Sequence, residues 1–112
     1  MKINFYKNGY EILGHINPLS CGEVSAMTYF CNGLILDNDE KAITYNGDNK
    51  GYTGIVFDIA NKWSIYLYNR LKDDLKEWAE NNFPKSEYEI IYLENNLSKE
   101  GVELQAKKIN LY

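Results

Sequence analysis

The feature that most constrains the fold is a one-sided apolar stripe that runs through residues 61–82. Its members recur at helical spacing, which predicts a long amphipathic helix. Phe83-Pro84 ends the pattern, because the residue before a proline disfavours helical backbone. A helix with one apolar face needs a second layer to cover it, so the rest of the chain must supply that layer. The stripe consists of Trp63, Leu67, Leu71, Leu75, Trp78 and Ala79.

Short runs of extended character supply the second layer. The first two runs are separated by Lys7-Asn8-Gly9, and Asn-Gly is a strong hairpin signal. The next two are separated by a glycine-rich turn at residues 46–51. β-Branched and aromatic residues mark the last run. The predicted strands are residues 2–6, 10–16, 41–45, 52–59 and 88–93.

Another helix is predicted to begin near Ser20, where the apolar pattern changes to helical spacing. Ser20 and Glu23 fit a capping box, with the serine at the N-cap and the glutamate three residues later. Asn32-Gly33 predicts that this helix ends near residues 34–36. Its stripe consists of Val24, Met27, Cys31 and Leu34, widened by Phe30 and Ile35.

These elements occur in the order β-β-α-β-β-α-β. The order predicts an α+β fold in which two helices pack on one face of a small mixed β-sheet. At 112 residues the chain is expected to form one domain spanning residues 1–112. The tail has two possible forms: a last strand near residues 102–106, or an arm.

Composition excludes several classes of function. The net charge of −4 argues against nucleic acid as the main partner, because phosphate binding requires clustered cations. The first residues are too polar for a signal peptide, and no apolar run is long enough to span a bilayer. We therefore expect a cytoplasmic location, no membrane partner and two reduced cysteines.

His15 and Cys21 are the residues most able to carry chemistry. His15 is the only histidine, and an imidazole can take a proton near neutral pH. Cys21 falls at the predicted start of a helix, where backbone amides and the helix dipole favour a thiolate. The pair therefore suggests a cysteine hydrolase, with His15 as base and Cys21 as nucleophile. The alternatives are that Cys21 is a small buried residue and His15 an ordinary surface or core residue.

Neighbouring residues could support such a site. Gly22 lacks a side chain and would let a substrate carbonyl approach the amides beside Cys21, as an oxyanion hole requires. Ser25 lies one helical turn after Cys21, although a serine inside a helix often bonds its own backbone. Cys31 lies on the apolar stripe and is predicted to be a core residue. No metal-binding signature or cofactor motif is present, so we expect neither a metal nor a cofactor.

These residues resemble the active-site segment of the ribosomal-processing cysteine proteases. In that family a Gly-His pair ends a strand, as Gly14-His15 does here, and a Cys-Ala-x-Val-Ser-x-Leu segment opens the first helix. The matching segment here is Cys21-Gly22-Glu23-Val24-Ser25-Ala26-Met27. The resemblance covers about residues 2–93 and leaves residues 94–112 as a C-terminal extension.

The resemblance implies a dimeric bacterial endopeptidase that removes an N-terminal extension from a large-subunit ribosomal protein. By position, His15 would be the general base and Cys21 the nucleophile. The segment between them is shorter than the family's loop, and Gly22 replaces the usual alanine. These departures suggest a divergent or phage-borne paralogue that acts on a related protein.

Two other hypotheses remain open at this point. The chain could be a non-catalytic paralogue that keeps the fold and the dimer and acts as a binding module. It could also be a redox- or metal-sensing thiol protein.

Overall fold

The structure is a computed structural model that describes residues 1–49, 51–58 and 60–110, with side chains described as far as Lys107. It has an α+β fold with five strands and three helices among these residues, which confirms the predicted class. In chain order the elements are β1 (Lys2–Tyr6), β2 (Gly9–Leu13), α1 (Pro18–Asn38), β3 (Ile43–Asn49), β4 (Tyr52–Phe57), α2 (Lys62–Asn82), β5 (Glu89–Tyr92) and α3 (Lys99–Asn110).

The strands form one mixed sheet in the order β3-β4-β2-β1-β5. The β1–β2, β2–β4 and β3–β4 pairs are antiparallel, and the β1–β5 pair is parallel. The predicted hairpin at Asn8-Gly9 is present, because Tyr6 pairs with Gly9 across the turn. This order places the β3–β4 hairpin at one edge of the sheet and β5 at the other.

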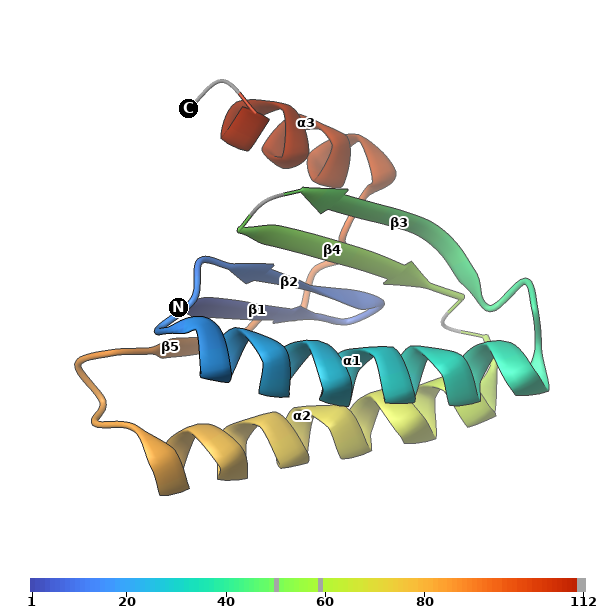
Figure 1. The fold of residues 1–112 in the computed structure, drawn as a ribbon. Coiled ribbons are helices and arrows are strands. Elements are labelled where there is room, and N and C mark those ends of the chain that lie inside the picture. Colours follow the sequence, from blue (N-terminus) through green and yellow to red (C-terminus); the bar gives the residue numbers. More distant parts are fainter. Residues whose placement is uncertain (50, 59, 111–112) are drawn as a thin grey trace.

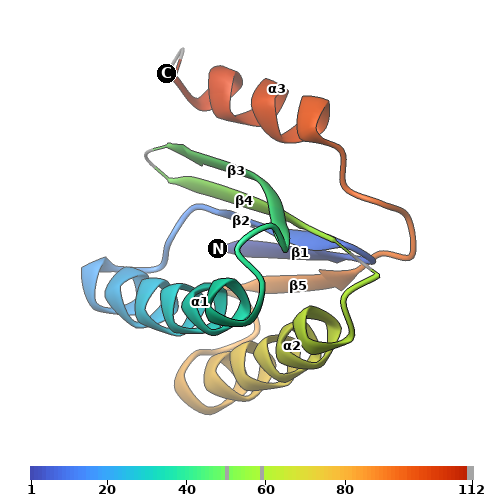
Figure 2. The same ribbon diagram turned by 90° about the vertical axis from the view of Figure 1, so that its right-hand side faces the viewer.

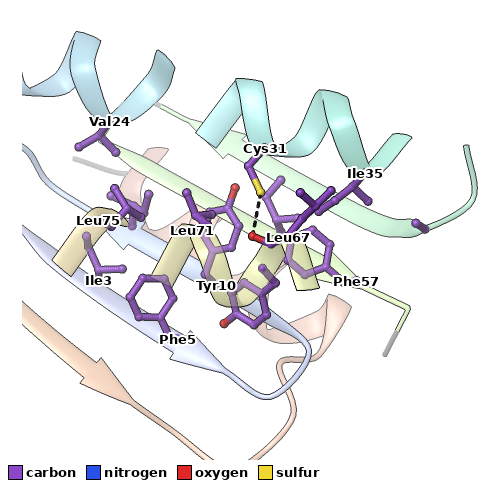
Figure 3. Packing of buried hydrophobic residues seen from close by; sticks show 14 residues of the cluster. Ile3, Phe5, Tyr10, Val24, Cys31, Ile35, Phe57, Leu67, Leu71 and Leu75 are labelled. Carbon is purple, nitrogen blue, oxygen red and sulfur yellow. Dashed lines mark hydrogen bonds between the residues drawn. The ribbon is translucent and has the colours of Figure 1, made fainter. Parts of the chain in front are cut away.

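Helices α1 and α2 lie side by side on one face of the sheet, as the sequence predicts (Figures 1 and 2). The stripe of α2 supplies Leu67, Leu71 and Leu75 to the core beneath them. These side chains meet Ile3 and Phe5 of β1, among others, as Figure 3 shows. Phe30 departs from its prediction, because its side chain is exposed rather than part of the buried stripe.

The opposite face of the sheet is covered over β3 and β4 by α3 (Figure 2). The predicted strand at residues 102–106 is therefore wrong, and so is the alternative of an arm. Val102 is fully buried on this face with Tyr52 and Val56. Gly47 and Gly54 make room for it, because a Cβ atom built on either glycine would lie within 2.8 Å of Val102 Cγ1.

A buried carboxylate also lies on the α3 face. Tyr6 and Tyr52 donate hydrogen bonds to the two oxygens of Glu11, at 2.8 and 2.6 Å respectively. These two hydrogen bonds offset the free-energy cost of burying the carboxyl group of Glu11.

The start of α1 differs from its prediction. Asn17 is the N-cap, Pro18 occupies the first turn, and Ser20 completes the capping box at the third position. The predicted box of Ser20 with Glu23 is therefore wrong. Asn17 satisfies the Ser20 amide, and proline at the first turn loses no hydrogen bond there. The helix also continues past the predicted end to Asn38.

Two strand boundaries shift as well. β2 ends at Leu13, and β3 continues through the predicted turn as far as Asn49, because it pairs with β4 up to Tyr52. Lys50, predicted in that turn, and Ile59, predicted at a strand end, lie outside the described residues.

Candidate active site

Gly14 directs the chain out of the sheet towards the site. Its φ of 72° is in the left-handed region that glycine adopts readily, and its amide donates to Gly51 O at 2.8 Å. This bond ties the end of β2 to the β3–β4 turn. His15 follows directly, and its side chain is exposed.

The capping box holds Cys21 close to the helix start. Asn17 Oδ1 accepts from the Ser20 amide at 2.8 Å, and Ser20 Oγ accepts from the Asn17 amide at 3.0 Å. Cys21 lies one residue further along α1 and is exposed. The alternative of a buried Cys21 is therefore wrong.

His15 and Cys21 line one cavity of about 150 Å³. The cavity lies between the first half of α1 and the end of the β3–β4 hairpin. Ser25 also lines it, on the same side of α1 as Cys21, and Ile12 and Val24 contribute apolar surface. The structure therefore brings together three of the four predicted site residues.

Within the part of the chain that the structure describes, no hydrogen bond joins His15 to Cys21. Catalytic hydrogen bonds are often long in an enzyme without substrate and shorten when substrate binds. Both residues are exposed and line the same cavity.

Cys31 has the opposite environment. It is buried between α1 and α2, where its Sγ donates to Leu67 O at 3.6 Å (Figure 3). Burial, with a smaller contribution from the Asp74 carboxylate, raises the pKa of the Cys31 thiol to about 11. Cys31 therefore stays protonated at neutral pH and is a core residue, as predicted.

Glu23 is directed away from the cavity. Trp78 Nε1 of α2 donates to Glu23 Oε2 at 2.5 Å, and Glu23 does not line the cavity. Its negative charge is therefore held at the α1–α2 contact, so it does not face the Cys21 sulfur.

Gly22, the fourth predicted site residue, does not line the cavity. The Cys21 amide donates to Asn17 O at 3.1 Å, and Gly22 lies one residue deeper in the helix. Amides at these positions bond to the carbonyl four residues earlier. In this conformation the amides beside Cys21 are hydrogen-bonded within α1. They are therefore not free to donate to an oxyanion, which was the role expected at Gly22.

Asp48 and Tyr29 also line the cavity, and sequence reasoning missed both. Asp48 pairs with Thr53 across the β3–β4 hairpin, and Thr53 Oγ1 donates to Asp48 Oδ1 at 3.2 Å. No local pattern marks Asp48, because only the pairing of β3 with β4 and the placement of α1 bring it beside Cys21. Tyr29 lies two turns after Cys21 in α1, so helical spacing alone places it on the same side of the helix.

Among the described residues, no three histidine, cysteine or acidic side chains converge in a way that could hold a metal ion. In the same part of the chain, no helix combines the length and the apolar character needed to cross a membrane.

Neither protein-family models nor curated proteins gave a match to this chain.

Proposed function

We propose that this chain is a cysteine endopeptidase in which Cys21 is the nucleophile and His15 the general base. What supports this most is that both side chains line one cavity, whereas the other cysteine is buried. The resemblance to the ribosomal-processing cysteine proteases adds the reaction type. The proposed substrate is an N-terminal extension of a large-subunit ribosomal protein or of a related phage protein, met in the cytoplasm.

The proposed reaction uses both residues twice. His15 takes the thiol proton as Cys21 Sγ attacks the peptide carbonyl carbon, and the C–N bond then breaks. The leaving amine takes its proton from His15. Water, deprotonated by His15, then attacks the thioester and releases the carboxylic acid together with the free Cys21 thiol. The structure assigns no donor for the oxyanion, and the proposal does not depend on Gly22.

The test is cleavage of synthetic peptides that span N-terminal extensions of large-subunit ribosomal proteins, followed by mass spectrometry. We expect the wild-type chain to cleave and Cys21→Ala to be inactive. Cys31→Ala is the matched control, because it removes the buried thiol and should retain cleavage. Equal cleavage by the wild type and Cys21→Ala would exclude the mechanism.

A non-catalytic homodimeric binding module is the second candidate, and one surface favours a dimer. The outer side of α1 and α2 exposes Phe30 and Tyr66 beside a groove that is also lined by Arg70 and Asp74. Arg70 and Asp74 already form an ion pair with each other at 3.4 Å within the chain, so the exposed aromatic side chains are what favours a second copy on this surface. Light scattering should then give the dimer mass for the wild type and the monomer mass for Phe30→Ser. A monomeric wild type would rule this surface out as a dimer interface.

A further inference from the structure

The cavity at Cys21 holds one acidic side chain. Among the described residues that line it, Asp48 carries the only carboxylate, and none is a lysine or an arginine. Met1 also lines the cavity, and its terminal ammonium donates to Glu87 O at 3.2 Å. The Asp48 side chain lies on the α1 side of the sheet with its partner Thr53, whose hydroxyl donates to Asp48 Oδ1. That bond fixes one carboxylate oxygen within the hairpin.

The rest of the lining suits a long cationic side chain. Ile12 and Val24 offer apolar surface against which the methylene stem of a lysine or arginine could lie. Tyr29, an exposed residue of α1, adds an aromatic ring, a type of side chain that attracts cations through its π-face. Acidic, aromatic and aliphatic groups from three elements therefore surround one small space.

We infer that this cavity takes a positively charged side chain of the substrate, with Asp48 as the residue that determines specificity. The inference rests on the proposed function, since it places a basic residue next to the bond that Cys21 attacks. It predicts that cationic compounds reach the Cys21 sulfur more readily than anionic compounds of the same size.

The test uses two thiol reagents of opposite charge, aminoethyl and sulfonatoethyl methanethiosulfonate. In each case the thiolate attacks the sulfenyl sulfur, a disulfide forms and methanesulfinate leaves. The rate of Cys21 modification is measured by intact mass and divided by the rate for a small free thiol. The ratio of the two normalised rates then reports the charge preference at Cys21 and needs no turnover.

Asp48→Asn is the informative variant, because it removes the charge and keeps an oxygen that can accept from Thr53. We expect the cation-to-anion ratio to fall several-fold, since Coulomb's law in water gives a two- to threefold change in each rate for two unit charges separated by roughly 6–8 Å. High salt should also lower the cation-to-anion ratio of the wild type, because salt screens the charge of Asp48.

Asp37→Asn is the matched control. It makes the same charge change at an exposed position of α1, about 24 Å along the helix from Cys21. The ratio should stay at its wild-type value in this variant, which separates a local effect from the net charge of −4.

The inference is overturned if Asp48→Asn leaves the ratio unchanged or slows both reagents equally. Equal slowing would mean that Asp48 acts on the reactivity of the thiol and not on the charge of the incoming group. The outcome is also separable from the proposed function. Peptide cleavage without the charge preference removes only this inference, and a charge preference without cleavage removes only the peptidase.

Discussion

At the scale of single residues, the two cysteines of α1 show how position within one helix determines reactivity. Cys21 lies near the N-terminus on the cavity side and is exposed. Cys31 lies on the side that faces α2, where burial raises its pKa to about 11. A thiol reagent at neutral pH therefore distinguishes them, because only a thiolate reacts quickly.

Tyr6 is expected to make the stability of the fold depend on alkaline pH. Burial, followed by its hydrogen bond to Glu11 and the charge of Glu11, raises the pKa of Tyr6 to about 12, from an ordinary value of 10.0. Between these values the unfolded chain has lost the proton that the folded chain retains. Stability from Tyr6 is therefore complete below about pH 10 and is lost as the pH rises towards about 12.

The variant Tyr6→Phe lacks this titrating group. Its free energy of unfolding, measured with urea at several pH values, should fall less steeply above about pH 10 than that of the wild type. Tyr66→Phe, at an exposed position of α2, is the control and should follow the wild-type curve more closely. Parallel curves for Tyr6→Phe and the wild type would refute the link between Tyr6 and alkaline stability.

At the scale of elements, strong periodicity predicted some boundaries closely. The strand at residues 2–6 matches β1, and the helix predicted at residues 61–82 matches α2 to within one residue. Asn61, predicted as the first helical residue, is instead the N-cap, where its side chain accepts from the Ser64 amide. The final packing uses the apolar pattern of β1, and it uses that of α2 except at Trp63, whose side chain is exposed.

α3 shows why other elements could not be predicted. Val102, Leu104 and Ala106 alternate with polar residues, a spacing that is also typical of a strand. The structure uses only Val102 and Ala106, one helical turn apart, and leaves Leu104 exposed. The decisive partners are glycines of β3 and β4, far away in sequence, that create the space for Val102.

A mutant cycle tests this packing. A Cβ atom at residue 54 would lie 2.8 Å from Val102 Cγ1, so we expect Gly54→Ala to cost about 1–3 kcal/mol through overpacking. Val102→Ala should cost roughly 2 kcal/mol through lost burial. The double variant should cost less than the sum, because the smaller residue 102 relieves the clash with Val102. The approach of the added Cβ atom to Tyr52 Oη, at 2.7 Å, is the same in both backgrounds.

Urea unfolding of the four proteins gives the coupling energy of this cycle. Gly33→Ala is the control, since nothing lies within 4 Å of a Cβ atom there. It should stabilise the chain by up to about 1 kcal/mol, because alanine favours helix more than glycine does. Strict additivity of Gly54→Ala and Val102→Ala would contradict the contact between residue 54 and Val102.

At the scale of the whole molecule, the sheet order creates the candidate site. Pairing of β4 with β2 places the β3–β4 turn beside the end of β2, and the bond from Gly14 N to Gly51 O joins them. α1 then crosses back over the sheet from the same corner (Figure 1). The sequence pointed to His15 and Cys21, but Asp48 depends on this long-range arrangement and could not be found from local pattern.

The central claim is that His15 and Cys21 act as one reacting pair. The most direct measurement is the second-order rate of Cys21 alkylation by iodoacetamide at neutral pH, in the wild type and in His15→Ala, with modification located by mass spectrometry. If His15 withdraws the thiol proton, its removal should slow the reaction several-fold, about tenfold where the imidazole governs the thiolate fraction. An unchanged rate in His15→Ala would contradict the pairing and leave the binding module as the better account.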